Sequence, residues 1–389
     1  MRKKLRSIPG THIISATVRT ILHITFFLIF NIFSKIENKK IVFESFNGKE
    51  YSCNPRAISE ELNKKDPNFK IIWLFLEPYE KINNIPNYVI KVKKKSLRAL
   101  YERYTAQIWV SNCQLPKYIL KRKKQLYLQT WHGDRAFKKI LYDYGKGKNI
   151  IENKICNVMT TGSKFGEKLL KSAFSYNGDL LRYGSPRNDI LINGDNREKD
   201  IIKEKLGIDK NTNIILFAPT FRKDNKRKQD IKEINLSEVI NKLKVKYNCN
   251  WICLIRSHSN VRELIFNKGT TNDVIDVSTY EDMADILLIS DLLITDYSSS
   301  AGDFVLKDKP VILFQPDRES YLKNDRELYI PIEETPFFVV NSQEELLEFI
   351  DEIKDNVVIN NCKEIMDFYG FYETGKASEK VVDYILKNP

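Results

Sequence analysis

The chain has 389 residues, 42% of them hydrophobic and 29% charged, and its formal net charge is +12 at pH 7. This length suits two folded domains rather than one, and the balance of apolar and charged residues excludes a chain that stays disordered. The positive excess suits an anionic partner, such as a membrane surface, a phosphorylated substrate or nucleic acid, although each single lysine run is typical of a solvated face.

Residues 1–36 differ from the rest of the chain. A basic cluster, MRKKLR, precedes an apolar run over 13–33 in which Arg19 is the only formal charge. Polar residues recur at helical spacing and would form one stripe: His12, Ser15, Arg19 and His23. The charge-free run after Arg19 has about 14 residues, fewer than the roughly 20 that span a bilayer, and no small-residue cleavage site follows. We therefore expect a basic amphipathic helix on the anionic cytoplasmic leaflet, with a single tilted span as the alternative.

From residue 40 onward, short apolar runs alternate with helix-length polar segments. The runs predict two series of strands, at 40–46, 70–76, 88–92, 106–111, 126–130, 156–161 and 181–185, then at 213–220, 251–257, 273–277, 291–296, 310–315 and 337–340. Nearly continuous apolar strands that alternate with helices are typical of parallel sheets buried on both faces. The pattern predicts an α/β protein with two doubly wound domains, at 37–195 and 196–389.

Two of the four histidines lie at the ends of predicted strands. His132 follows the run at 126–130, in the stretch QTWHGDRAFKKI, whose basic end predicts a helix. His258 follows the run at 251–257. Because ligands of such sheets bind beyond the carboxyl ends of the strands, both histidines would face a cleft between the domains. A near-neutral pKa suits imidazole to removing a proton from a hydroxyl or supporting a leaving phosphate, whereas a hydrogen-bonded structural histidine is the alternative.

The stretch DLLITDYSSSAGDFVL predicts an anion site. Its strand ends at Asp296, and three hydroxyls then begin a helix: Ser298, Ser299 and Ser300. Free backbone N–H groups at a helix start suit a diphosphate, although ordinary capping by one serine is the alternative. Upstream, Ser278 and Glu281 have capping-box spacing, which predicts a helix over STYEDMADILLIS.

Two arginines also follow predicted strands. Arg222 comes just after Thr220 in the stretch APTFR, and Arg256 precedes His258 by two residues. Arginine suits bidentate contacts to phosphate, and pairing with surface acids is the alternative for each.

Other classes of function lack their motifs. The sequence has no P-loop, no GxGxxG and no GxSxG, which disfavours ATPase, dinucleotide and hydrolase functions. The six cysteines have no zinc-site spacing and are expected to be buried thiols, and no acidic cage indicates a metal. The basic runs lack interleaved aromatic residues, so no nucleic-acid partner is expected.

Together these residues resemble the CDP-glycerol glycerophosphotransferases of Gram-positive teichoic-acid assembly, over about residues 40–375. The resemblance rests on QTWHGDRAFKKI, GSPRND, APTFR, DVSTYEDMADILLISDLLITDYSSSAGDF and PVILFQPD. The long stretch that contains TDYSS is the most specific of these. The resemblance implies a GT-B-like fold of two Rossmann-like domains, action at the inner membrane leaflet, and transfer of polyol phosphate from a CDP-alcohol to a lipid-linked acceptor.

The resemblance also implies roles for single residues. His132 corresponds to the base that deprotonates the acceptor hydroxyl, His258 to the second essential histidine beside the donor diphosphate, and Asp296–Ser299 to the donor-phosphate loop. Further cleft residues are expected on the same motifs: Trp131, Gly133, Thr220 and Asp303. Many members have Thr-Pro where Asp134 and Arg135 follow WHG here, and many have proline after the second histidine.

The function implied is a membrane-associated transferase without a cofactor. It would move glycerol phosphate, or another polyol phosphate, from CDP-glycerol or another CDP-polyol to an undecaprenyl-linked glycan, and release CMP. The N-terminal helix would hold it peripherally on the cytoplasmic face of the cell membrane, and the length favours a primase-like or short-chain transferase. A GT-B glycosyltransferase that uses a nucleotide sugar is the alternative, and a non-catalytic membrane-docking protein is the third choice.

Overall fold

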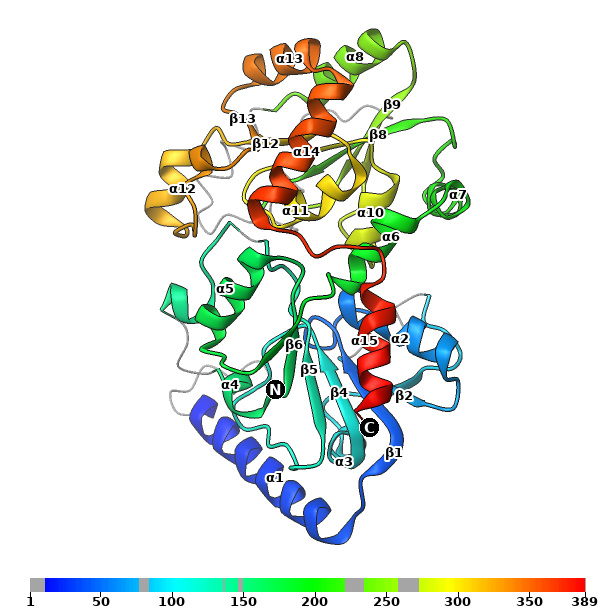
Figure 1. Ribbon diagram of the computed structural model, residues 1–389, viewed down its shortest axis with the longest axis vertical. Helices are drawn as coiled ribbons and strands as arrows, with labels where there is room; N and C mark the ends of the chain where they lie inside the picture. The colour runs from blue at the N-terminus through cyan, green and yellow to red at the C-terminus, as the bar shows by residue number, and fades with distance from the viewer. Residues whose placement is uncertain are drawn as a thin grey trace.

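Two parallel sheets, one above the other in Figure 1, form the body of the protein. The computed structural model describes residues 11–76, 84–135, 137–145, 150–220, 234–257 and 273–388, with the side chains of 11–16 and 19 left out. The first sheet has the strand order β3-β2-β1-β4-β5-β6-β7, and the second has the order β10-β9-β8-β11-β12-β13. The predicted α/β architecture of two Rossmann-like parallel-sheet domains is therefore confirmed.

The strands lie close to the predicted runs. The first sheet contains β1 (Glu37–Glu44), β2 (Lys70–Phe75), β3 (Ile90–Lys93), β4 (Ala106–Ser111), β5 (Leu126–Gln129), β6 (Val158–Thr160) and β7 (Asp179–Leu181). The second contains β8 (Asn213–Ala218), β9 (Trp251–Ile255), β10 (Val274–Asp276), β11 (Leu292–Thr295), β12 (Val311–Phe314) and β13 (Phe338–Val340). Only β7 is clearly displaced from its predicted run, 181–185, because the chain turns at Gly184, whose φ is +97°.

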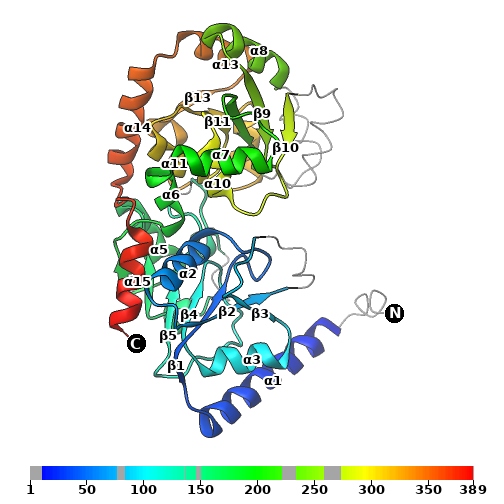
Figure 2. The same ribbon diagram turned by 90° about the vertical axis from the view of Figure 1, so that its right-hand side faces the viewer.

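The helices cover both faces of the sheets (Figures 1 and 2). Those up to the end of β7 are α1 (Thr11–Phe33), α2 (Cys53–Lys65), α3 (Leu97–Thr105), α4 (Glu152–Ile155) and α5 (Lys164–Phe174), with the 3-10 turn η3 (Leu141–Tyr144). Those after β7 are η5 (Pro186–Asn188), α6 (Asp189–Asn193), α7 (Asn196–Lys205), α8 (Leu236–Tyr247), α10 (Met283–Ile289), α11 (Ser300–Phe304), η8 (Val305–Lys307), α12 (Arg318–Asn324), η9 (Ile332–Glu334), α13 (Gln343–Glu352), α14 (Asp355–Tyr369) and α15 (Ala377–Lys387).

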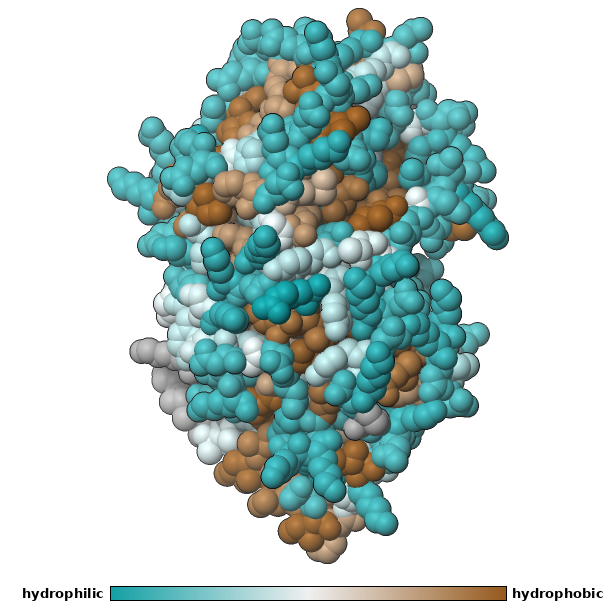
Figure 3. Space-filling view, in the orientation of Figure 1, coloured by the Kyte–Doolittle hydropathy of each residue, from teal (hydrophilic) through white to brown (hydrophobic). Residues whose placement is uncertain are grey.

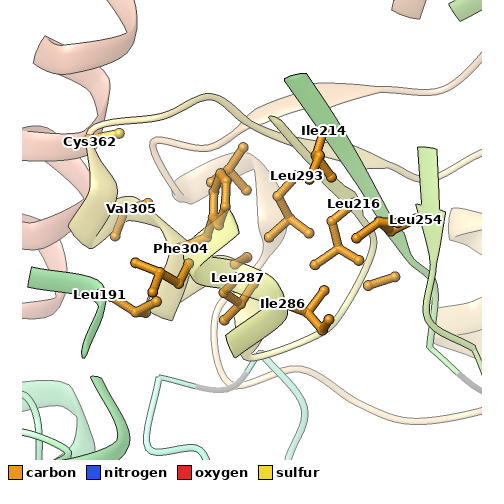
Figure 4. Close-up of a cluster of buried hydrophobic side chains, with 14 of the residues drawn as sticks. Leu191, Ile214, Leu216, Leu254, Ile286, Leu287, Leu293, Phe304, Val305 and Cys362 are labelled. Carbon is orange, nitrogen blue, oxygen red and sulfur yellow. The ribbon is translucent and has the colours of Figure 1, made fainter. Parts of the chain in front are cut away.

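Alternate strand residues enter different cores. In the second sheet, Leu216 and Leu293 pack in one cluster with α10 and α11 (Figure 4), whereas Ile215 and Ile294 pack in another against α8. Because both faces are buried, the strands are nearly continuous apolar runs, which is why the sequence revealed them.

The last helix returns to the first sheet. Val381, Val382 and Ile385 of α15 pack with Ile41 and Phe43 of β1, while α14 covers the second sheet (Figure 2). The sequence placed residues 377–387 in the C-terminal domain, and the structure corrects this, because the apolar face of α15 completes the first core. The boundary near residue 195 stays a prediction.

The N-terminal helix α1 lies along α3, at the end of the molecule away from the second sheet (Figures 1 and 2). Phe27 packs edge-on against Tyr104 and Phe30 edge-on against Tyr101, with ring centroids 5.6 and 5.7 Å apart. The opposite face exposes aliphatic side chains, and Figure 3 shows hydrophobic residues gathered at this end: Val18, Ile21, Leu22, Leu28, Ile29 and Ile32. His23 faces Tyr104 rather than forming part of an outer polar stripe. Within the described ranges, none of the helices combines the length and apolarity needed to cross a membrane.

Candidate active site

A cavity of about 380 Å³ lies between the sheets, at the carboxyl ends of β1, β5, β8, β9 and β11. Seven of the predicted site residues line it together: His132, Thr220, Arg256, Ser298, Ser299, Ser300 and Asp303. Residues that the sequence did not single out complete the walls, among them Phe46, Glu50, Cys53, Arg187 and Asp282. His258 and Arg222 lie outside the described residues.

His132 is held in the tautomer that a general base needs. Its Nδ1 lies 2.6 Å from the carbonyl oxygen of Asn112. Because a carbonyl only accepts, Nδ1 carries the hydrogen and Nε2 keeps its lone pair. Burial lowers the pKa of His132 to about 4, with a smaller contribution from Arg187, against the hydrogen bond to Asn112 that raises it. The imidazole is therefore neutral at physiological pH, packed between the rings of Trp131 and Phe46.

The loops that carry these groups have strained backbones. Four residues other than glycine adopt positive φ beside the cavity: Phe46 (44°), Asn47 (61°), Cys53 (65°) and Trp131 (49°). Trp131 donates its backbone N–H to the Gln129 side chain and accepts a hydrogen bond from Asn54 through its carbonyl oxygen. Such conformations cost about 1–3 kcal/mol each and persist where surrounding bonds enforce them, often at functional sites. After the turn at Trp131, the side chain of His132 lines the cavity.

Gly133 allows the two halves of the cavity to meet. A methyl group in place of its hydrogen would lie 2.6 Å from Oγ of Ser299. The WHG loop of the first sheet and the serine loop of the second are therefore in direct contact. Ser299 precedes α11 without making a capping hydrogen bond from its side chain, and Ser300 instead donates from its Oγ to Oγ of Ser298 at 2.9 Å.

Asp296 is buried behind the cavity and forms hydrogen bonds that hold the surrounding loops in place. The backbone N–H of Thr220 donates to both carboxylate oxygens of Asp296 at 3.0 Å, and the N–H of Tyr297 donates to Oδ1. Asp296 is 2% exposed and is not among the residues that line the cavity. Its position fixes the ends of β8 and β11 relative to each other, which suits a carboxylate better than contact with a like-charged phosphate.

Arg256 presents a charge to the cavity without forming an ion pair with a described residue. Its guanidinium donates to the backbone carbonyl oxygens of Val277 (3.3 Å) and Tyr280 (2.7 Å). Across the described part of the chain, no carboxylate lies within ion-pair distance of it. Burial lowers the pKa of Arg256, although nearby acids, Glu50 first among them, oppose that effect. A bound anion would remove this cost of burying a charge.

A buried ionic network ties the two sheets together behind the cavity. Arg135, directly after the WHGD stretch, bonds Asp303 at 2.7 Å and Glu373 at 2.6 Å, and its side chain is 1% exposed. Arg187 bonds the other oxygen of Asp303 at 2.8 Å. Burial alone would raise the pKa of Asp303, but Arg187 and Arg135 hold it below its usual value. The predicted cleft residue Asp303 thus forms ion pairs with two arginines for which the sequence predicted no role in the site.

The Asp134-Arg135 departure from the family pattern is buried as well. Oδ2 of Asp134 accepts hydrogen bonds from Thr161 Oγ1 and from the backbone N–H of Gly162. Both side chains are buried in the body of the protein, and Arg135 is the one of the two that reaches Asp303 and Glu373.

The basic helix predicted at the end of QTWHGDRAFKKI is wrong. Phe137 packs in the second core, with its ring 5.4 Å from that of Phe337. Lys138 forms an antiparallel bridge with Leu328, and the N–H of Lys139 donates to the carbonyl of Glu327 at 2.9 Å. The backbone of this segment is extended because it pairs with the second domain, and it ties the loop of His132 to that domain.

The predicted capping box at Ser278 is also wrong. The helix α10 begins at Met283, and Oδ1 of Asp282 accepts the N–H of Ala284. Ser278 Oγ instead accepts the N–H of Ser257 at 3.0 Å. Oδ2 of Asp282 accepts the N–H of Cys53 at 2.9 Å, so this cap is a further contact between the two halves.

Comparison with known proteins gives three consistent results. Residues 25–387 match the family described as CDP-Glycerol:Poly(glycerophosphate) glycerophosphotransferase. The chain is 32% identical over 372 residues to the teichoic acid poly(glycerol phosphate) polymerase of Bacillus subtilis (strain 168), covering 90% of this chain but 49% of that protein. It is 30% identical over 398 residues to the teichoic acid glycerol-phosphate transferase of Staphylococcus aureus (strain NCTC 8325 / PS 47), covering 96% and 100%. A structure of a variant of the wall teichoic acid polymerase TagF soaked with CDPG is 28% identical, with a TM-score of 0.80 and 96% of each chain covered. The chain thus spans about half the length of some relatives and nearly all of others.

Proposed function

This chain belongs to the CDP-glycerol:poly(glycerophosphate) glycerophosphotransferase family, and we propose that it transfers glycerol phosphate from CDP-glycerol to a hydroxyl acceptor in teichoic-acid synthesis. One observation carries the proposal beyond family membership. The neutral His132, with a free Nε2 lone pair, shares a cavity with the mostly buried Arg256, which forms no ion pair with the described residues. A base beside a cationic group that suits an anion favours attack of a hydroxyl on a bound diphosphate.

In the proposed reaction, His132 takes the proton of the acceptor hydroxyl through Nε2. The acceptor oxygen forms a bond to the β-phosphorus of the donor as the bond from that phosphorus to the bridging oxygen breaks. CMP leaves with the electron pair of the broken bond. The negative charge of the bound diphosphate raises the pKa of the imidazole from about 4 toward neutral pH, where a general base works best.

The cations and amides of the cavity would stabilise the charge on the diphosphate. Arg256 and Arg187 supply guanidinium groups, and the loop Ser298–Ser300 supplies backbone N–H groups and hydroxyls. Preorganised charge of this kind is usually the largest catalytic contribution in phosphoryl transfer. The family resemblance adds His258 to this set, and the position of Arg222 just after a predicted strand adds that arginine.

We also propose that α1 lies on the membrane surface with its aliphatic face in the lipid. The enzyme would then work beside an undecaprenyl-linked acceptor on the cytoplasmic side. Its aromatic face is already packed on Tyr101 and Tyr104, whereas Leu28, Ile29 and Ile32 are 51%, 41% and 70% exposed. An unpartnered aliphatic face next to a basic N-terminal cluster is typical of an interfacial helix.

Product identification tests the function. The protein is incubated with a lipid-linked disaccharide and, in separate reactions, CDP-glycerol, CDP-ribitol and a set of nucleotide sugars, and the lipid products are weighed by mass spectrometry. The proposal predicts an increment of one or more glycerol phosphate units with release of CMP. A hexose increment from a nucleotide sugar would instead identify a glycosyltransferase.

A further inference from the structure

Glu50 occupies a place in the cavity that none of the sequence motifs covers. It follows β1, the third strand in the order of the seven-stranded sheet, after a turn in which Phe46 and Asn47 have positive φ. Its side chain lines the cavity together with His132 and Arg256. Because a carboxylate repels a diphosphate, its presence in a cavity proposed to bind one needs an explanation.

One oxygen of the Glu50 carboxylate forms a hydrogen bond with a described residue, and the other does not. Oε2 accepts a hydrogen bond from Ser52 Oγ at 3.0 Å, and within the described residues Oε1 has no hydrogen-bond partner. The guanidinium of Arg256 is close enough to lower the pKa of Glu50, but burial is the larger effect and leaves that pKa raised. Arg256 directs its Nη1 at the carbonyl oxygens of Val277 and Tyr280 rather than at Glu50. A desolvated carboxylate oxygen is thus open to the cavity.

The chemistry of a carboxylate limits what it can bind there. An ionised carboxylate only accepts hydrogen bonds, so it repels phosphate oxygens and attracts donors. Arg256 and Arg187 lie in the same walls and suit the phosphates. The hydrogen-bond donors that CDP-glycerol offers are its hydroxyls and the amino group of cytosine, and of these a pair of neighbouring hydroxyls can bond both carboxylate oxygens.

We propose that Glu50 binds the hydroxyl groups of the polyol that is transferred, and so selects polyol phosphates among CDP-linked donors. This inference rests on the proposed function, because it presumes a CDP-polyol in the cavity. Hydrogen bonds to a charged group are worth about 1.5–3 kcal/mol, which corresponds to a change in donor affinity of roughly 10- to 150-fold.

Donor binding without acceptor tests the proposal, because no transfer occurs during the measurement. Calorimetric Kd values are compared for CDP-glycerol, for CDP-1,3-propanediol, which lacks the central hydroxyl, and for the 2′-deoxyribose form of CDP-glycerol. Wild type and Glu50→Gln are measured with each ligand. Glu60→Gln serves as the matched control, because Glu60 lies on α2 and lines the neighbouring groove.

Wild type and Glu60→Gln are expected to bind CDP-glycerol about tenfold or more tightly than CDP-1,3-propanediol. Glu50→Gln is expected to lose most of this preference while still binding the propanediol donor as wild type does. An unchanged preference in a folded Glu50→Gln protein would overturn the inference, and so would a loss confined to the deoxyribose comparison, which would assign Glu50 to the ribose. Absence of CDP-glycerol binding by wild type would instead refute the proposed function itself.

Discussion

Asp303→Asn tests the ionic network that joins the two sheets. Asp303 is 5% exposed, and its two oxygens bond Arg135 at 2.7 Å and Arg187 at 2.8 Å. Removing one partner of a buried ion pair costs about 3–5 kcal/mol, because the remaining charge stays buried and unpaired. Arg135 keeps Glu373 at 2.6 Å, and Arg187 borders the cavity, where water can reach it. We therefore expect the lower end of this range, about 3 kcal/mol of unfolding free energy.

Urea unfolding followed by tryptophan fluorescence measures this loss, and the chain offers a matched control. Lys139 and Glu327 also join the two halves, at 2.6 Å, but Glu327 is 71% exposed. Glu327→Gln is expected to cost less than about 1 kcal/mol, as solvent-exposed pairs do. If Asp303→Asn were as stable as Glu327→Gln, the network would not stabilise the interface and our account of Arg135 would be refuted.

Three further predictions concern His132, the serine loop and α1. The unfolding free energy should fall by at most about 3 kcal/mol as the pH drops from about 6.5 to about 4. The cause is that the unfolded chain binds a proton in this pH range that the buried His132 does not bind. In urea titrations at several pH values, His132→Gln should lack this contribution. Ser298→Ala combined with Ser299→Ala should weaken CDP-donor binding more than acceptor binding in calorimetry, and unchanged donor affinity would leave a purely structural role for the loop. Leu28→Gln combined with Ile32→Gln should release the protein from anionic vesicles in flotation assays, since each buried aliphatic side chain contributes about 1.5–3 kcal/mol. Val245→Gln, at a site 83% exposed on the distant α8, should have no effect, and equal binding by both variants would remove α1 from the membrane contact.

The sequence predicted the features that follow from local pattern. Strands buried on both faces, such as β8 and β11, appear as continuous apolar runs, and the carboxyl-end rule brought His132, Arg256 and the serine loop to one cleft. The family resemblance drawn from the motifs is confirmed by the match over residues 25–387.

What the sequence missed depends on contacts between distant residues. Arg135 and Glu373 are 238 positions apart, and no local pattern indicates that they pair. The FKKI segment has helical composition but pairs with residues 327–329, so tertiary hydrogen bonds override its local preference. Ser278 had the right spacing for a cap, yet its hydroxyl is engaged by Ser257 and Asp282 caps the helix. Glu50 belongs to none of the sequence motifs, because its proposed role depends on the residues that line the cavity with it.

The central claim is that His132 acts as the general base, whereas other residues of the same cavity bind the CDP donor. Its most direct test is the rate of glycerol phosphate transfer by His132→Gln, measured together with the Kd of CDP-glycerol. Loss of a general base typically costs about 10²–10⁴-fold in rate. The account predicts at least a hundredfold lower kcat with donor affinity within about threefold of wild type. A folded His132→Gln protein that transfers glycerol phosphate at the wild-type rate would contradict it.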